Sequence, residues 1–328
     1  MTDSSSLLMS VVVPTYQRPD LLERCMNALL RQTMAPEAYE IIVCDDGPSL
    51  SAQRVVKSLP LTSGGRPLVR YIAVTATQGP AGARNAGWRA AMAPIIAFTD
   101  DDTVPDPGWL QSGALAMAVP ADAAVGRIVM PLPENPSDYQ KDAARLQDAE
   151  FATANCFVRR DALEAVGGFD ERYTSAWRED SDLHFSLLKK GYTIVKVPEA
   201  VVVHPLRPAR FAAGIAMQRK VMFDVLLYRK HPDLYRQRIR SGAPWFYLSV
   251  SACLVTTVAA LLSGWYTLAL ASAMAWGGLS LFFFLRRLMD SSFTVRNVVE
   301  LFVTSIFIPP LSIFWRAAGV VRFGWGVP

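Results

Sequence analysis

Three consecutive aspartates, Asp100-Asp101-Asp102, follow the apolar run at residues 94–99. Neighbouring carboxylates repel one another and raise each other's pKa unless a cation compensates. In an extended chain Asp100 and Asp102 point to the same side, and divalent ions such as Mg²⁺ or Mn²⁺ bind such oxygens together with phosphates. An isolated acidic triplet is more often a solvated turn, but the end of a buried strand favours a metal site at Asp100 and Asp102.

A second acidic pair, Asp45-Asp46, follows the apolar run at residues 40–44 and precedes Gly47. A carboxylate at a strand end can accept hydrogen bonds from a nucleobase or from ribose hydroxyls. The alternative is an ordinary Asp-Gly turn.

The segment at residues 79–85, GPAGARN, places small residues at the start of a predicted helix. Small residues permit close approach of a ligand to the backbone, and a helix N-terminus attracts anions. Arg84 would add a contact to a diphosphate. The segment is neither GxGxxG nor a P-loop lysine motif, so alone it is a weak indication.

The segment at residues 177–183, WREDSDL, brings acids to the first turn of another predicted helix. The helix dipole stabilises acids there, which is a sufficient structural explanation. The functional alternative is a general base for an alcohol acceptor. The glycine-rich segment at residues 166–171 would then hold this base against a bound nucleotide.

The elements that position these groups alternate between strand and helix. Strands are predicted at residues 9–13, 40–44, 68–74 and 94–99, and helices begin at Pro19 and Gly79. This alternation predicts an α/β domain with a largely parallel, doubly wound sheet. Ligands bind beyond the carboxyl ends of the strands in such sheets, which is where the acidic clusters lie.

The second part of the chain is hydrophobic. Residues 245–262 and 265–285 are uncharged and long enough to span a bilayer as two helices joined by a tight turn. Basic residues flank both outer ends, which places both ends on the cytoplasmic side. The alternative is a buried hairpin in a soluble core, although the uncharged length exceeds what such a hairpin needs.

A third apolar segment, residues 298–315, contains Glu300 and Pro309-Pro310 and is followed by arginines. A third span would place those arginines outside, against the charge rule. We therefore expect an interfacial or re-entrant helix that is broken at the prolines.

These features divide the chain into residues 1–205, a catalytic domain; 206–243, basic juxtamembrane helices; and 244–328, a membrane domain. Nine Lys and Arg against two acids between residues 207 and 240 indicate an anionic membrane surface, and the net charge of +4 gives no reason to expect nucleic acid. The four cysteines lack paired spacing, and the N-terminus lacks a signal-peptide pattern. We expect a multi-pass protein of the cytoplasmic membrane, with its catalytic domain in the cytoplasm.

Six short segments, in order, resemble family 2 inverting glycosyltransferases with the GT-A fold. They are residues 13–18 (VPTYQR), 42–47 (IVCDDG), 82–87 (GARNAG), 98–102 (FTDDD), 167–171 (GGFDE) and 179–183 (EDSDL). Each is short, but six in the family's order are specific, and together they cover about residues 8–205.

The resemblance implies a role for each matching position. Asp180 would be the catalytic base, which deprotonates an acceptor hydroxyl so that it attacks the anomeric carbon opposite the leaving nucleotide. Asp100, Asp102 and His204 would bind Mn²⁺ or Mg²⁺, although a lone histidine is more often structural. The nucleotide-sugar donor would be bound by Pro14, Thr15, Tyr16, Arg18, Asp45, Asp46, Arg84, Asn85, Asp100, Asp101 and Glu179.

The implied function is transfer of one sugar, most simply from a UDP-sugar, to a lipid-linked or membrane-surface acceptor in polysaccharide or glycolipid biosynthesis. Processive synthases of the family carry a QxxRW motif, which Gln218-Arg219-Lys220 does not match. A processive polysaccharide synthase and a non-catalytic, nucleotide-binding membrane scaffold stay open as alternatives. A Rossmann-type oxidoreductase is disfavoured because GxGxxG does not follow the first strand. The sequence does not indicate an oligomeric state.

Overall fold

The computed structural model describes residues 7–59 and 67–326, which form two compact units. The first unit lies within residues 1–131 and 145–205. The second comprises residues 132–144 and the chain from residue 206 onward. Residues 132–144, which the sequence division assigned to the catalytic domain, thus pack with the hydrophobic part of the chain.

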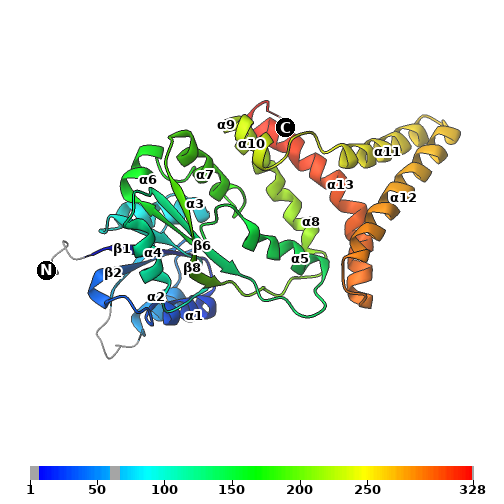
Figure 1. Ribbon diagram of the computed structural model, residues 1–328. Helices are drawn as coiled ribbons and strands as arrows, with labels where there is room; N and C mark the ends of the chain where they lie inside the picture. The colour runs from blue at the N-terminus through cyan, green and yellow to red at the C-terminus, as the bar shows by residue number, and fades with distance from the viewer. Residues whose placement is uncertain (1–6, 60–66, 327–328) are drawn as a thin grey trace. The chain divides into compact units, whose positions relative to one another are not determined.

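The first unit is built around a mixed sheet (Figure 1). Among the described residues the strand order is β3-β2-β1-β4-β7-β6-β8-β5. The first four strands along the chain are β1 (Met9–Thr15), β2 (Tyr39–Asp45), β3 (Leu68–Ala73) and β4 (Ile95–Phe98). All three pairings among these strands are parallel. They form the half of the sheet that the sequence predicted.

The other half contains β5 (Val104–Pro105), β6 (Ala123–Val129), β7 (Cys156–Arg159) and β8 (Ile194–Val203). Strand β7 runs antiparallel to β4 and β6, and β5 runs antiparallel to β8, while β6 and β8 are parallel. The antiparallel β7 carries the segment that precedes it, residues 151–155, to the edge where β4 ends.

Helices cover both faces of the sheet, because successive strand residues point to opposite sides. Val11 and Val13 of β1 belong to one hydrophobic core, and Val12 belongs to the other. The first core is covered by α1 (Pro19–Leu29), α2 (Leu50–Lys57) and α4 (Trp109–Met117), and the second by α3 (Pro80–Ala90), α6 (Arg160–Val166) and α7 (Glu179–Lys189). The α/β class expected from the sequence is confirmed.

The sheet register explains why the polar clusters meet. Thr15 at the end of β1 pairs with Asp45 at the end of β2, and β4 runs parallel to β1 and ends at Phe98 beside Val12. The turn at residues 100–102 therefore emerges at the same edge as Thr15 and Asp45. This is the edge formed by the carboxyl ends of the parallel strands, where the sequence predicted the acidic clusters.

The second unit is helical in the part of the chain that the structure describes. Its helices are α5 (Asp138–Ala144), α8 (Ala213–Met217), η4 (Gln218–Val221), α9 (Met222–Lys230), α10 (Pro232–Arg238), α11 (Trp245–Leu262), α12 (Tyr266–Met289) and α13 (Val295–Phe323). Asp138 of α5 forms an ion pair with Arg287 of α12 at 2.6 Å. The Arg287 guanidinium also donates to the hydroxyls of Thr304 and Ser305 on α13. This ion pair joins residues 132–144 to the rest of the second unit.

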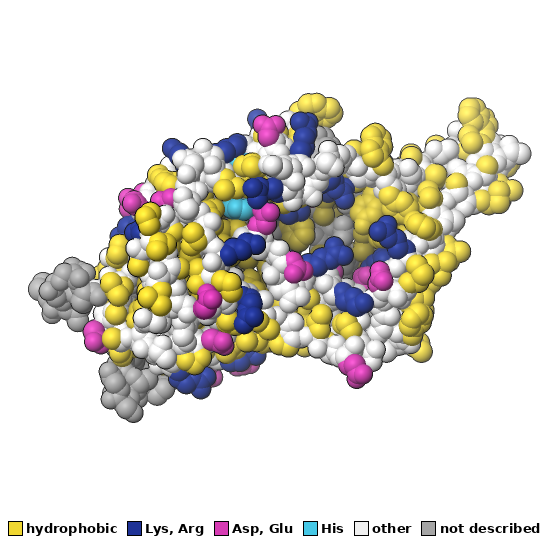
Figure 2. All heavy atoms as spheres, in the orientation of Figure 1, with side chains coloured by type: hydrophobic (Ala, Val, Ile, Leu, Met, Phe, Trp, Pro, Cys, Tyr) yellow, Lys and Arg dark blue, Asp and Glu magenta, His cyan; other side chains and the backbone are white. Residues whose placement is uncertain are grey.

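Three of these helices, α11, α12 and α13, are long and apolar enough to cross a membrane. Hydrophobic side chains predominate on the surface of α11 and α12 (Figure 2), with Leu262, Tyr266 and Met274 among the exposed ones. A hydrogen bond of 2.9 Å between the hydroxyls of Thr257 and Ser272 joins the two helices. Exposed apolar surface of this extent indicates association with a membrane.

The expected break of the third apolar segment at Pro309-Pro310 is wrong, because α13 continues through both prolines. The fixed φ of proline suits a helix, and each proline removes only one backbone donor. Ending the helix there would leave about four carbonyls unsatisfied before the break and about four amides unsatisfied after it. In apolar surroundings the continuous helix loses fewer hydrogen bonds.

Candidate functional site

The turn at residues 100–102 has a fixed backbone. The hydroxyl and the amide of Thr103 donate to the Asp100 carbonyl at 2.7 and 3.2 Å. The buried Cys25 thiol of α1 lies 3.4 Å from the same carbonyl. Thr99, immediately before the turn, donates its hydroxyl to the Ala154 carbonyl at 3.0 Å. The turn is thus held from α1 and from the segment before β7.

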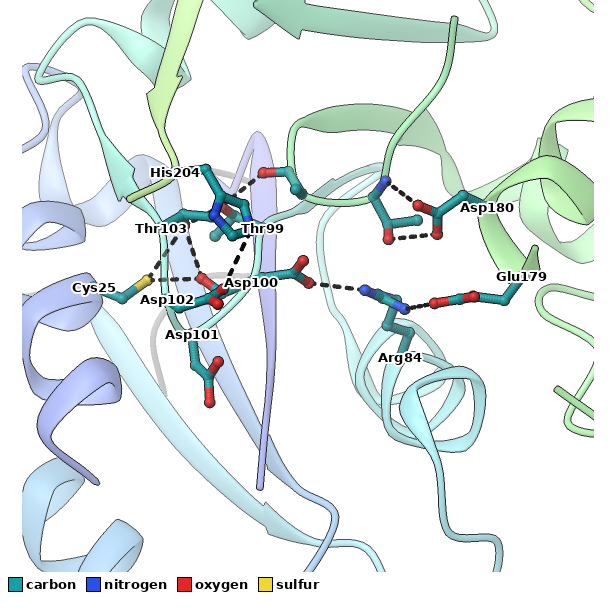
Figure 3. A network of polar contacts seen from close by, with 12 residues as sticks. Cys25, Arg84, Thr99, Asp100, Asp101, Asp102, Thr103, Glu179, Asp180 and His204 are labelled. Atoms are coloured by element: carbon teal, nitrogen blue, oxygen red, sulfur yellow. Dashed lines mark hydrogen bonds and ion pairs between the residues drawn. The ribbon is translucent and has the colours of Figure 1, made fainter. Parts of the chain in front are cut away.

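The three carboxylates of this turn point in different directions (Figure 3). Asp101 is fully buried, accepts a hydrogen bond of 2.7 Å from the Thr15 hydroxyl, and lies 3.1 Å from the Arg18 guanidinium. Burial raises the pKa of Asp101 to about 6, against the opposing effects of Arg18 and Thr15. Asp101 therefore anchors the turn to the end of β1.

Asp100 and Asp102 meet His204, which directly follows β8. The Nε2 atom of His204 lies 3.5 Å from Oδ1 of Asp102, and one donor atom from each of the three residues lies within 4.8 Å of the other two. The buried Nδ1 atom of His204 has no hydrogen-bond partner among the described residues. Two carboxylates and an imidazole are donors that a divalent metal ion accepts. The residues present therefore fit such an ion.

Arg84 of α3 links the acidic turn to the start of α7. One nitrogen of its buried guanidinium lies 2.8 Å from Asp100, and another lies 3.1 Å from Glu179 (Figure 3). Burial opposes the charge of Arg84, but Asp100, Asp180 and Glu179 more than offset this effect and raise its pKa. A permanent cation thus lies between the candidate metal ligands and the candidate base.

Glu179 and Asp180 begin α7, directly after Arg178, whose φ of 73° lies in the left-handed region. Burial raises the pKa of Glu179 to about 7, and the neighbouring Asp180 adds to this effect while Arg84 opposes it. The pKa of Asp180 is also raised by burial, against the opposing effect of Arg84. A carboxyl whose pKa is raised towards neutrality is a stronger base when ionised.

Asp180 has a partner that sequence reasoning missed. Thr153 donates its hydroxyl to Oδ1 of Asp180 at 2.7 Å and its amide to Oδ2 at 3.3 Å. Thr153 is a lone threonine between two alanines, so no pattern in the sequence singles it out.

The predicted donor-site residues at the end of β2 are engaged by the chain itself. Asp45 accepts hydrogen bonds from the amide of Gly47, from the amide and hydroxyl of Ser49, and from the hydroxyl of Tyr71, at 2.7 to 3.3 Å. Asp46 accepts from the Gly79 amide, which lies 2.8 Å from both of its oxygens. Asp45 fixes the turn, and Asp46 joins that turn to the start of α3.

Asn85 is engaged in the same way. Its side-chain amide donates to the Phe169 carbonyl and to Glu171, each at 2.8 Å, and its oxygen accepts from the Phe169 amide and the Trp88 indole. These bonds use its full capacity. Asn85 therefore fixes the glycine-rich loop against α3.

The remaining predicted residues lie at the end of β1. Pro14 is buried within the strand, and Tyr16 directly follows it and is half-exposed, with its ring against Gly47. The contacts form two sets, one of Thr15, Arg18, Asp101, Asp102 and His204 and one of Arg84, Asp100 and Glu179. The two sets meet at the turn of residues 100–102, where Asp100 lies close to Asp102 and His204. Asp180 lies beside Glu179 at the edge of the second set.

Comparison with known sequences identifies two matching family models. The model described as "Glycosyl transferase family 2" matches residues 10–173, and "Glycosyl transferase family group 2" matches residues 95–313. The validoxylamine A glucosyltransferase of Streptomyces hygroscopicus subsp. limoneus is 30% identical over 267 residues, 69% of this chain and 57% of the relative. The pre-mycofactocin glycosyltransferase of Mycobacterium tuberculosis is 27% identical over 284 residues, 78% and 56% of the two chains. The chain thus spans less than two thirds of the length of these relatives.

Two solved structures share the fold. The mannosyltransferase PcManGT from Pyrobaculum calidifontis, in complex with GDP-Man and Mn²⁺, matches with a TM-score of 0.55 and 18% identity over 93% of this chain and 89% of its own. S. aureus TarS 1–349, in complex with UDP-GlcNAc, matches with a TM-score of 0.52 and 14% identity over 95% and 92%. At this level of identity the likeness is one of fold.

Proposed function

Because the chain belongs to glycosyl transferase family 2 and is a glycosyltransferase, we propose that it transfers one sugar from a nucleoside diphosphate sugar, with inversion at the anomeric carbon. One observation carries this proposal. Arg84 joins Asp100 of the metal-ligand cluster to Glu179, which adjoins Asp180. The buried Arg84 guanidinium thus links a candidate leaving-group site to the residue beside a candidate base.

Asp180 acts as the general base in this proposal. It accepts the proton of the acceptor hydroxyl as the oxygen attacks the anomeric carbon, and the bond from that carbon to the diphosphate oxygen breaks. A single displacement by an oxygen opposite the leaving group inverts the configuration. The raised pKa of Asp180 supports this role, since an ionised carboxylate of raised pKa holds a proton more readily.

The leaving diphosphate is placed at the edge where β1 and β4 end. Arg84 and Arg18 supply positive charge there, and Arg18 is partly exposed. Asp100, Asp102 and His204 would hold a divalent ion, Mn²⁺ or Mg²⁺. When bound, such an ion neutralises charge that develops on the departing diphosphate.

In this proposal the nucleotide lies at the same edge, between loops that residues of the chain hold in place. Asp45, Asp46 and Asn85 act by fixing loops, and Tyr16 offers an exposed ring beside Gly47. A UDP-sugar is the first donor to test. A GDP-sugar is the second, because TarS binds UDP-GlcNAc and PcManGT binds GDP-Man.

The acceptor is proposed to lie at the cytoplasmic face of a membrane. Helices α11 and α12 form the spanning hairpin, and each has only 11% of its apolar window buried inside the structure. A lipid-linked or membrane-surface glycan would be concentrated at that face. The basic residues between 207 and 240 suit anionic headgroups there.

Helix α13 is proposed to lie at the interface, on the side of α9. Arg316 of α13 and Asp224 of α9 form a buried ion pair at 3.0 Å. The backbone of Gly319 packs against the Met222 carbonyl, and Arg229 donates to the Phe323 carbonyl. If α13 spanned the bilayer, the charged helix α9 would have to enter it. Alkaline phosphatase fused after Pro328 should be inactive and a fluorescent-protein fusion bright; an active phosphatase would indicate a third span.

The catalytic proposal is tested on the detergent-solubilised full chain with a panel of UDP- and GDP-sugars. Asp180→Asn should lower turnover at least about 100-fold, while the donor still raises the melting temperature. Unchanged turnover in this variant would overturn the role of Asp180.

The metal proposal has a separate readout. EDTA should abolish turnover and Mn²⁺ should restore it. His204→Ala should raise the Mn²⁺ concentration for half-maximal activity at least about tenfold. An unchanged metal requirement in this variant would show that His204 is not a metal ligand.

A further inference from the structure

We infer that Thr153 is a positioning residue, which fixes the orientation of the Asp180 carboxylate and favours its ionised form. This inference rests on the proposed role of Asp180. The Thr153 side chain is fully buried. Its hydroxyl and amide bind one oxygen each of the Asp180 carboxylate, at 2.7 and 3.3 Å. Two donors from one residue fix the plane of a carboxylate more tightly than one donor would.

The segment that carries Thr153 is fixed by the two residues that follow it. The next residue, Ala154, accepts the Thr99 hydroxyl through its carbonyl at 3.0 Å. The following residue, Asn155, accepts from the Trp109 indole and donates to the carbonyls of Arg127 and Ala200, at 2.8 to 2.9 Å. Thr153 therefore has little freedom to move, and it transmits this rigidity to Asp180.

The same segment relates the base to the metal turn. Thr153 holds Asp180, and adjacent Ala154 holds Thr99, which directly precedes Asp100. The spacing between the acceptor's base and the leaving-group site is thus set by two consecutive residues. A single displacement requires this spacing, because attacking and leaving oxygens must lie on opposite sides of one carbon.

The hydroxyl of Thr153 also stabilises the charged form of Asp180. A hydrogen bond donated to a carboxylate favours its ionised state. The charged and titratable groups around Asp180 are Arg84 of α3, Asp100 of the turn, Glu179 of α7 and Cys156 of β7. Arg84 favours the ionised form of the Asp180 carboxylate. Asp100 and the burial of Asp180 both disfavour the ionised form. Losing the hydroxyl should leave Asp180 protonated over a wider pH range.

The test measures turnover against pH for variants of the full chain in detergent. Thr153→Val keeps the shape of the side chain and removes the hydroxyl, and Thr153→Ser keeps the hydroxyl and removes the methyl. We expect Thr153→Val to move the acidic limb of the kcat profile upward by about one pH unit. We expect kcat below that limb to fall about tenfold, with KM for the donor within about twofold of wild type. Thr153→Ser should keep the wild-type profile.

A matched control is available at the opposite end of β1. The buried Ser10 hydroxyl donates to Oε1 of Glu40 at 2.7 Å, which is also a buried hydroxyl–carboxylate pair. Ser10→Ala should lower the melting temperature without moving the pH profile. The pH profile of Thr153→Val will differ from that of Ser10→Ala only if the Thr153 hydroxyl acts on the reaction.

Asp180→Asn separates failure of the inference from failure of the proposed function. If Asp180→Asn is inactive and Thr153→Val keeps the wild-type acidic limb, the role of Thr153 is overturned while the base assignment stands. If Thr153→Ser is as impaired as Thr153→Val, keeping the hydroxyl does not preserve the wild-type profile, and the inference is wrong. If Asp180→Asn is fully active, the base assignment and the inference both fall.

Discussion

The ends of β2 and β4 carry the same residue type at the same edge of the sheet, yet their aspartates have different partners. Asp45 and Asp46 accept hydrogen bonds from neutral amides and hydroxyls of neighbouring loops. Asp100, Asp101 and Asp102 face the guanidinium groups of Arg18 and Arg84 and the imidazole of His204.

The difference indicates that partners, rather than position in the fold, separate a structural acid from a candidate reactive one. Neutral donors occupy the lone pairs of Asp45 and fix a turn. Cations balance charge at the end of β4 without enclosing Asp100, whose side chain keeps 26% of its surface exposed. Accessible charge of this kind can bind a metal ion or a diphosphate.

The largest expected effect is at the end of β4. Asp102→Asn removes a candidate metal ligand and should lower turnover about 1,000-fold. It should also abolish the rise in melting temperature that Mn²⁺ gives the wild type. The matched control is Asp106→Asn, which removes an exposed carboxylate four residues further along and should change neither. Equal turnover in Asp102→Asn and the control would refute the metal assignment.

A smaller effect of a different kind is expected at the end of β2. Asp45→Asn places an amide donor against the donors of Ser49 and Tyr71. This conflict should destabilise the fold by about 2 kcal/mol, or about 5 °C in melting temperature. Turnover at a temperature where the variant is folded should stay within about tenfold of wild type. If Asp45→Asn lost as much turnover as Asp102→Asn without a change in melting temperature, the proposed difference between the two strand ends would be wrong.

The smallest effect concerns Glu179, which shares Arg84 with the β4 end. The pKa of Glu179 is raised from 4.5 to about 7 in the folded chain, so the folded state binds more protons than the unfolded state between these values. The contribution of Glu179 to stability is therefore present below pH 4.5 and is lost as the pH rises towards 7. Relative to Glu179→Gln, the wild type should lose on the order of 1 kcal/mol over this range. Melting curves from pH 4.5 to 7.5 measure it, and parallel curves for the two proteins would contradict the raised pKa.

The parallel half of the sheet could be predicted from the sequence because its strands and helices have clear periodicities. The expected strands at residues 9–13, 40–44 and 94–99 correspond to β1, β2 and β4, and parallel pairing brings their ends together. The later strands had no such pattern. Strand β8 contains Lys196, Pro198 and Glu199, and β5 has two residues.

The acids of the candidate site could be found from the sequence, but their partners could not. The role of Asn85 follows from Phe169 and Glu171, which lie more than 80 positions away. Thr153 meets Asp180 only because β7 runs antiparallel to its neighbours and delivers the segment before it to this edge. Such pairings are set by tertiary structure, and local patterns do not encode them.

The placement of residues 132–144 in the second unit has a practical consequence for the design of truncated proteins. The chain passes between the two units three times, after residues 131, 144 and 205. A stop codon after Pro205 would remove Arg287 and the backbone of Asp290 and Ser292, which bind Asp138, Lys141 and Pro136. A water-soluble catalytic fragment therefore requires two edits, a C-terminal stop and replacement of residues 132–144 by a polar linker.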